Sequence, residues 1–119
     1  MRYALLIYAS EQEWANQSEE ESQAQFQEYM AFTKDIVDRG IYKSGEALQA
    51  TATATTVRVR DSETLTTDGP FAETKEQLGG YYVVEAKDLD EAIEIAARIP
   101  DVRRGSIEIR PIMEMDMPS

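Results

Sequence analysis

The stretch YALLIY, residues 3–8, decides how the rest of the chain can fold. It is short, aliphatic and aromatic, which is typical of a buried β-strand. Side chains alternate between the two faces of a strand. One face carries Tyr3, Leu5 and Ile7, and the other carries Ala4, Leu6 and Tyr8. Both faces are rich in apolar groups, so the pattern predicts a strand that is covered on both sides.

The segment that follows predicts a long amphipathic helix. Ser18 and Glu21 have the spacing of a capping box, and Gly40 stands where a left-handed residue ends a helix. Between these two signals a set of side chains recurs at helical spacing and shares one face. They are Phe26, Tyr29, Met30, Thr33, Ile36 and Val37.

The middle of the chain predicts further strands. TTVRVR, residues 55–60, alternates between apolar and polar side chains, and DSET, residues 61–64, can form a turn. GYYVVEA, residues 80–86, has the β-branched and aromatic composition of another strand.

The last third of the chain predicts a second helix and a final strand. Asp88 with Glu91 caps a second helix, and Pro100 ends it. SIEIRPIM, residues 106–113, alternates as a strand does, and the tail MDMPS, residues 115–119, is expected to be loosely ordered.

The order strand, helix, strands, strand, helix, strand predicts an α+β fold, the ferredoxin-like split βαβ arrangement with an antiparallel sheet, in a single domain over residues 1–119. Its two helices cover only one face of the sheet, whereas the first strand has two faces to bury. We therefore expect a homodimer in which a second subunit packs sheet to sheet and encloses a cleft.

The final strand assigns its side chains to the two faces of this sheet. Ile107 and Ile109 are expected to face the helices, which places Glu108 and Arg110 on the opposite, dimer-facing side. A charged pair there either lines the cleft or joins the subunits, and the sequence leaves both interpretations open.

The acidic composition argues against two classes of partner. The chain of 119 residues has 23 acidic and 12 basic side chains, a formal net charge of −11. This charge repels nucleic-acid phosphates and anionic lipid headgroups, so we expect neither nucleic acid nor a membrane as a partner. We interpret the acidic excess as solvated surface.

Cysteine and histidine are both absent. Their absence excludes disulfides, thiolate nucleophiles, Ser-His and Cys-His relays and zinc motifs that use histidine. The sequence also lacks the glycine-rich nucleotide-binding motifs, and we expect no cofactor and no metal. No apolar run is long enough to span a bilayer and the first residues lack a signal-peptide cleavage site, so we expect a cytoplasmic protein.

The stretch TDGPFAETKEQLGGYY, residues 67–82, holds the candidate functional residues. Asp68, Gly69 and Pro70 are typical of a turn, because Asp bonds nearby backbone, Gly accepts positive φ and Pro fixes the exit. Phe71 is expected to anchor the loop in the core, which is the common fate of a single aromatic residue in a loop.

Three charged residues next to this turn allow two interpretations. If the segment forms a helical turn, Glu73 and Glu76 are neighbours, and two close carboxylates can raise one pKa into the range of general acid or base catalysis. Lys75 could instead neutralise them, and runs of charge are usually solvated.

The run DGPFAETKEQLGGYYVVEAKDLDEAIEIAARIP, with SGEAL upstream and IEIRPI downstream, resembles the DGPF subgroup of the YCII-related domain family over nearly the whole chain. The resemblance implies ferredoxin-like subunits that form a dimeric α/β barrel. The wider family has a suggested His-Asp active-site pair, which this chain cannot supply because it has no histidine. Relatives of the DGPF type tend to accompany, or to be fused to, extracytoplasmic-function sigma factors.

The preferred interpretation is a homodimer with a cleft that binds an unidentified small molecule, with acid-base catalysis as a further hypothesis. The candidate catalytic residues are Asp68, Glu73 and Glu76. The candidate ligand-binding residues are Arg110, Lys75 and Phe71, and the loop-shaping residues are Gly69 and Pro70. The alternative is a non-enzymatic regulatory module that associates with a sigma factor of this class.

Overall fold

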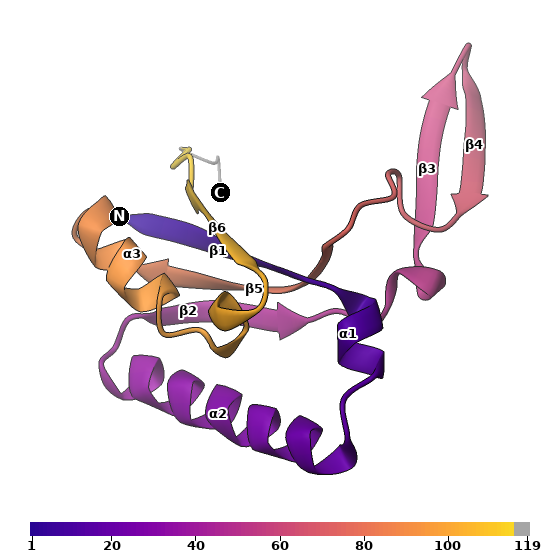
Figure 1. Ribbon diagram of the computed structural model, residues 1–119. Coiled ribbons are helices and arrows are strands. Elements are labelled where there is room, and N and C mark those ends of the chain that lie inside the picture. The colour runs from indigo at the N-terminus through magenta and orange to yellow at the C-terminus, as the bar shows by residue number, and fades with distance from the viewer. Residues whose placement is uncertain (116–119) are drawn as a thin grey trace.

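The computed structural model describes residues 1–115 and has an α+β architecture (Figure 1). Four strands form one antiparallel sheet in the order β2-β5-β1-β6. They are β1 (Arg2–Ala9), β2 (Tyr42–Ala47), β5 (Gln77–Glu85) and β6 (Ser106–Pro111). This order and the antiparallel pairing agree with the expected ferredoxin-like split βαβ arrangement. The tail over residues 115–119, expected to be loosely ordered, lies outside the described residues except for Met115.

The remaining elements are helices, short turns and a separate hairpin. The helices are α1 (Glu11–Ala15), α2 (Glu19–Asp38) and α3 (Leu89–Ala96), and the 3₁₀ turns are η1 (Thr51–Thr53) and η2 (Pro100–Arg103). The hairpin consists of β3 (Thr55–Arg60) and β4 (Glu63–Asp68) and forms its own two-stranded sheet. Among residues 1–115, no helix is both long and apolar enough to cross a membrane.

The predicted capping box begins α2. The Glu21 backbone N–H donates to Ser18 Oγ at 3.1 Å, and the Ser18 N–H donates to the Glu21 carboxylate at 3.4 Å. Gly40 follows the helix with φ of +74°, as expected of a left-handed stop.

The face that α2 turns toward the sheet is narrower than predicted. The buried residues of the helix are Gln25, Phe32 and Ile36. Three of the predicted core residues lie beside this line and are at least half exposed: Phe26 at 64%, Met30 at 57% and Val37 at 50%. Successive residues of a helix are 100° apart, so these three lie about 100° or more from a stripe centred on Phe32 and Ile36, and therefore outside it.

The core lies between α2, α3 and one face of the four-stranded sheet. Tyr3, Leu5 and Ile7 of β1 are buried there, together with Tyr82 and Val84 of β5. Ile107 and Ile109 of β6 pack against the same core, which confirms the sides predicted for the last strand.

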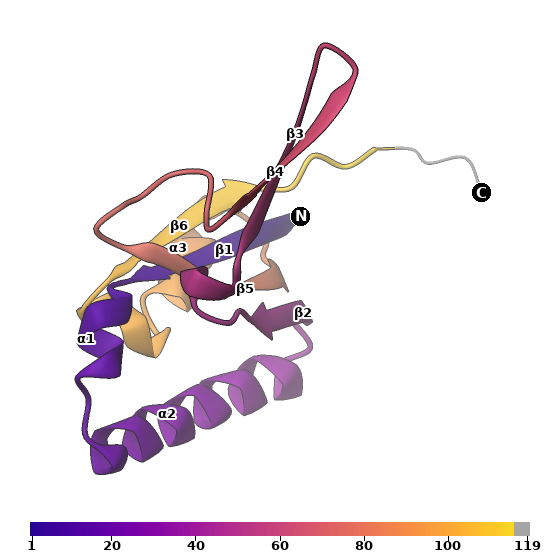
Figure 2. The same cartoon turned by 90° about the vertical axis from the view of Figure 1, so that its right-hand side faces the viewer.

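The predicted strand at residues 55–60 forms, but outside the main sheet. Its place in the sheet is taken by β2, which was not predicted as a strand. Asp61 and Ser62 both have positive φ and turn β3 directly into β4, so the turn is shorter than the predicted residues 61–64. The hairpin stands away from the four-stranded sheet and the helices in two perpendicular views (Figures 1 and 2).

The projecting hairpin makes the subunit unusually extended. The radius of gyration is 16.6 Å, whereas a compact domain of this length is expected to have about 13.5 Å. Nearly every hairpin residue is exposed; Thr56 is half-buried.

The second face of the sheet is not covered by the helices of the same subunit. It carries Ala4, Leu6 and Tyr8 of β1, Tyr81 and Val83 of β5, and Glu108 and Arg110 of β6. We call this surface the open face. Its apolar side chains are half-buried, because neighbouring side chains of the sheet shield them from the side only.

Candidate functional site

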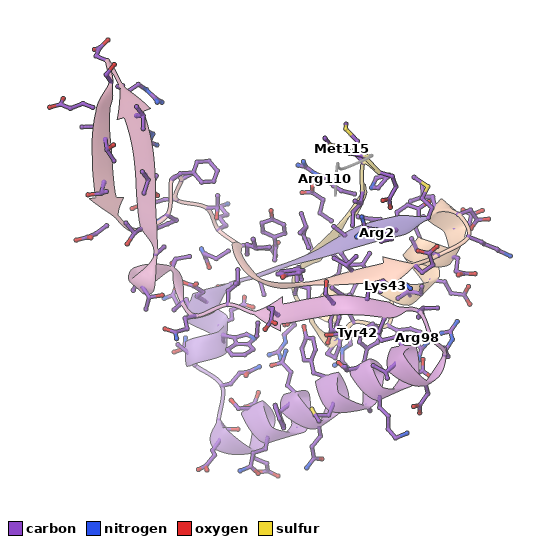
Figure 3. All side chains as sticks on the ribbon, turned by 180° about the vertical axis from the view of Figure 1, so that it is seen from behind. Arg2, Tyr42, Lys43, Arg98, Arg110 and Met115 are labelled. Atoms are coloured by element: carbon purple, nitrogen blue, oxygen red, sulfur yellow. The ribbon has the colours of Figure 1, made fainter. Side chains whose placement is uncertain are left out.

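The two ends of the open face differ in chemistry. At one end, Arg2 and Arg110 extend from the neighbouring strands β1 and β6 (Figure 3). The Arg110 guanidinium donates to the Glu108 carboxylate two residues away, and Arg2 donates to both carboxylate oxygens of Glu114, at 2.9 and 3.0 Å. This end therefore holds two guanidinium groups whose present partners are exposed carboxylates, which an anionic ligand could replace.

The ion pair with Arg2 affects the protonation of its partner. Hydrogen bonding to Arg2 is the main cause that lowers the pKa of Glu114 below its usual value. Glu85, also on the open face, has a lowered pKa because it accepts a hydrogen bond from the N-terminal ammonium group at 2.8 Å. These carboxylates are thus held in the charged form, which is the wrong state for a general acid at neutral pH.

At the opposite end of the open face, β6 begins at Ser106. Its hydroxyl donates to the Glu76 carboxylate at 2.9 Å, and Ser106 lies opposite Tyr8 of β1. Glu76 is half-buried, so the loop before β5 places one predicted carboxylate beside this end. Arg110 is four residues further along β6, about 13 Å away at the rise of a strand, so one subunit does not bring Glu76 and Arg110 together.

The turn at Asp68 is held by backbone groups. Gly69 has φ of +101°, its N–H donates to Ala54 O at 2.7 Å, and its carbonyl accepts from Thr56 Oγ1 at 2.8 Å. Asp68 is exposed, and within residues 1–115 its carboxylate accepts no hydrogen bond from a protein group. The predicted side-chain bond of Asp68 is therefore not formed, while the need for glycine at the next position is confirmed.

Phe71 does not anchor the loop. Its exposed fraction is 81%, so the prediction that this ring enters the core is wrong. The core face is already filled by side chains from α2, α3 and the sheet. Phe71 is thus the most exposed large apolar side chain of the described residues.

The segment that carries Glu73, Lys75 and Glu76 is not a helical turn. Thr74 Oγ1 donates to the Glu76 carbonyl, and Gln77 Nε2 donates to the Thr74 carbonyl at 2.6 Å, which gives the segment an irregular, locally bonded shape. Glu73 and Lys75 are exposed, and none of the three charged side chains forms an ion pair within residues 1–115.

A shallow hollow of about 280 Å³ lies beside this segment. Its lining residues are Thr51, Pro70, Ala72, Glu73, Thr74 and Gln77. Glu73 is the only charged group in this lining, so this predicted catalytic residue faces a hollow of the subunit itself.

Three residues that the sequence did not single out support this hollow. Glu11 accepts from Thr51 with both carboxylate oxygens, from the N–H at 2.7 Å and from Oγ1 at 2.8 Å. The Glu11 N–H in turn donates to the Gln77 side chain at 2.9 Å. The one sequence signal for this arrangement is Ser10, whose side chain caps α1 and so fixes the position of Glu11. No sequence pattern near Glu11 predicts its contact with Thr51, which is 40 residues away.

A buried polar cluster lies on the helix side of the sheet, away from the open face. Asp101 is 5% exposed and accepts from Gln25 Nε2 at 2.9 Å and from the Tyr29 hydroxyl. Burial, and then the hydrogen bond to Asp101, raise the pKa of Tyr29. The cluster joins α2 to η2, and both carboxylate oxygens of Asp101 accept hydrogen bonds within it. In the part of the chain that the structure describes, no group of acidic residues is arranged to hold a metal ion.

Comparison with known proteins is consistent with this picture and gives no reaction. The model of the YCII-related domain family matches residues 1–116. The uncharacterised protein R00369 of Rhizobium meliloti (strain 1021) is 37% identical over 114 residues, which cover 94% of this chain and 92% of that protein. The chain therefore belongs to the YCII-related domain family.

Proposed function

We propose that the protein is a homodimer whose open faces meet and enclose a cleft for a small molecule, as in a dimeric α/β barrel. The observation that carries this proposal is the open face itself. Leu6, Tyr81 and Val83 lie at its centre, half-buried and without a covering layer. A sheet whose two faces are both apolar normally has a covering layer on each, and the helices of this subunit supply only one.

A cleft of this kind would have apolar walls with a few polar groups at its ends, which is the usual composition of a small-molecule site. Arg110 is proposed to bind an anionic part of the ligand, and Glu76 to be the proton carrier at the other end. In an antiparallel two-fold arrangement, Arg110 of one subunit would lie toward Glu76 of the other, which removes the separation that a single subunit imposes.

The loop residues have lesser roles in this proposal. Glu73 is a second candidate proton carrier at the hollow, and Asp68 is a polar group at the mouth of the cleft. Lys75 and Phe71 are exposed and would contact a ligand or the second subunit. We assign the chain to the DGPF subgroup of its family on the run DGPFAETKEQ.

A second candidate is a regulatory module that binds a sigma factor and has no catalytic activity. The exposed ring of Phe71 favours a macromolecular contact of some kind, since exposed aromatic side chains are enriched at protein interfaces. The two candidates differ in whether a small molecule binds the protein by itself.

A thermal-shift screen of small carboxylic and phosphoric acids tests the proposal. A ligand at 100 times its Kd stabilises the native state by about 2.7 kcal/mol, which raises the melting temperature by several degrees. Arg110→Ala should abolish the shift, while Lys34→Ala, which removes an exposed cation of α2, should keep it. A shift that survives Arg110→Ala would contradict the assigned role.

Catalysis is tested separately from binding. The ligand found in the screen is incubated with the wild-type protein and followed by mass spectrometry. Turnover that Glu76→Gln removes while the thermal shift remains would support a proton carrier. Binding without turnover would leave the protein as a binding module, and the failure of all these acids to bind would favour the regulatory candidate.

A further inference from the structure

The β3–β4 hairpin has two chemically different faces. Residues paired across the hairpin share a face, so Val57 and Val59 lie on the same side as Thr66 and Thr64 of β4. Apart from Asp68, which pairs with Thr55 at the base of the hairpin, this side carries no charge, and both valines are 59% exposed. We call residues 55, 57, 59, 64 and 66 the uncharged face. The other side carries Arg58, Arg60 and Glu63, as expected of a surface that faces water.

The base of the hairpin is fixed to the domain. Glu11 holds Thr51 of η1 through two hydrogen bonds, and η1 leads directly into β3. On the other strand, the bond from Gly69 N–H to Ala54 O closes the base, and Thr56 adds a second bond to Gly69. These bonds fix the base of the hairpin, so the hairpin projects in a direction that the domain sets.

An isolated hairpin of this kind is marginally stable in water. Two strands without a third strand or a covering helix bury too little apolar surface to offset the ordering of their backbone. This hairpin nevertheless has well-formed pairing over six residue pairs and an uncharged face with no cover. These two features are typical of a projecting arm that is stabilised by contact with a second molecule.

The area available for a dimer interface indicates that the molecule in contact with the hairpin is a second subunit. The open face is about 19 Å wide and about 20 Å long, so two such faces would bury about 800 Å². A stable specific interface buries about 1,200–2,000 Å² in total. One face of the hairpin has an area of about 200 Å². Each hairpin would bury this area and an equal area of the other subunit, so the two hairpins of a dimer would add about 800 Å² of buried surface. The open faces alone fall short, and the two arms supply the difference.

The geometry points to a second copy of this chain as the occupant: in the dimer, the uncharged face of each β3–β4 hairpin packs on the other subunit as a reciprocal arm. The contact is reciprocal because a two-fold dimer repeats every contact. The inference rests on the proposed dimer and goes beyond it, since sheet-to-sheet contact alone would leave both arms in solvent.

Single cysteines test the arm directly, because the chain has none of its own. A nitroxide on Val57→Cys reports on the uncharged face, and one on Arg58→Cys, the next residue, reports on the opposite face as a control. On raising the protein concentration through the dimerisation range, the label at residue 57 should become immobile and the label at residue 58 should stay mobile.

A pair of charge substitutions tests the contribution of the arm to assembly. Val57→Asp places a carboxylate on the uncharged face, and Leu65→Asp makes the equivalent change on the other face of the same hairpin. By sedimentation equilibrium, Val57→Asp should raise the dimer Kd by about 100-fold or more, and Leu65→Asp by less than about 5-fold, where tenfold corresponds to 1.4 kcal/mol. Far-UV circular dichroism of both variants checks that the domain remains folded.

The outcomes separate the arm from the dimer. A dimer of wild-type affinity in Val57→Asp, with a mobile label at residue 57, would overturn the arm and leave the sheet-to-sheet dimer in place. A protein that is monomeric at every concentration would overturn both. Immobilisation of the label in a subunit that stays monomeric would also overturn the arm, because the hairpin would then fold onto its own domain.

Discussion

Replacing Phe71 by alanine should leave the stability of the single subunit unchanged and weaken its contact with a second molecule. The ring is 81% exposed and makes little contact with the rest of the domain. A Phe side chain buries about 150–250 Å², so about 160 Å² of this ring is free, and its complete burial would contribute up to about 4 kcal/mol at about 25 cal/mol per Å². Part of this free energy is offset by the entropy lost on association, so we expect each ring to contribute about 2 kcal/mol to the binding free energy, roughly 30-fold in affinity.

Phe32→Ala is the matched control, because it makes the same substitution in the opposite environment. Phe32 is 5% exposed, and its ring centre lies 5.2 Å from that of Tyr82 in an edge-to-face contact. Truncating a buried phenylalanine typically costs about 3–5 kcal/mol of unfolding free energy. The two variants should therefore separate cleanly: Phe32→Ala in urea unfolding of the subunit, and Phe71→Ala in sedimentation or ligand titration.

The urea experiment is run at a protein concentration low enough for the single subunit, so that dissociation does not enter the unfolding free energy. A loss above about 1.5 kcal/mol in Phe71→Ala under these conditions would contradict the reasoning, since it lies outside the usual range for an exposed residue. Unchanged unfolding together with unchanged dimer and ligand affinity would refute the docking role of the ring.

Three further predictions follow from the same contacts. Asp101→Ala removes the acceptor of Gln25 and Tyr29 in a buried site, so urea unfolding should show a loss of about 2–4 kcal/mol, and a loss below 1 kcal/mol would contradict the cluster's role. Gly69→Ala should lower the unfolding free energy by about 1–2 kcal/mol, because an alanine is strained at positive φ. Asp68→Ala should change the unfolding free energy by less than about 0.5 kcal/mol. A larger loss in Asp68→Ala than in Gly69→Ala would indicate that the Asp68 side chain holds the turn after all. Three carboxyl groups have a pKa lowered by ion pairs, so their stabilisation is present above the unfolded pKa and is lost as the pH falls through the folded values. They are Asp35, Glu85 and Glu114. Unfolding midpoints measured from pH 7 downward should fall in the acid range and less steeply at high salt, whereas midpoints that rise on acidification would contradict the ion pairs.

Several elements could be predicted from sequence because their causes are local. The capping box of α2 needs only Ser18 and Glu21 at the right spacing, and the side assignment of β6 needs only the alternation of Ile107 and Ile109 with charged residues. The strand YALLIY was predicted to have two apolar faces, and the structure buries one of them in the core and leaves the other as the open face.

The second strand of the sheet could not be predicted in this way. β2 reads YKSGEA and has neither an apolar run nor a clean alternation. It is an edge strand, and Gly45 fits there because a Cβ would lie 2.9 Å from the Tyr82 ring. The alternating segment at residues 55–60 looked like a better sheet strand, since alternation alone does not say which sheet a strand joins.

The sequence by itself determined the α+β class, both ends of α2, the start of α3 and which side chains of β1 and β6 share a face, because these follow from the periods of helix and strand and from capping. It did not predict α1, and it placed the end of the second helix at Pro100, whereas α3 ends at Ala96. The tertiary structure decided that Phe71 is in solvent, that Glu76 meets Ser106 30 residues away, that Glu11 holds Thr51 and that the β3–β4 hairpin projects as an arm. The environment of such a side chain is set by groups remote in sequence, and no local pattern carries information about which remote groups will be its neighbours.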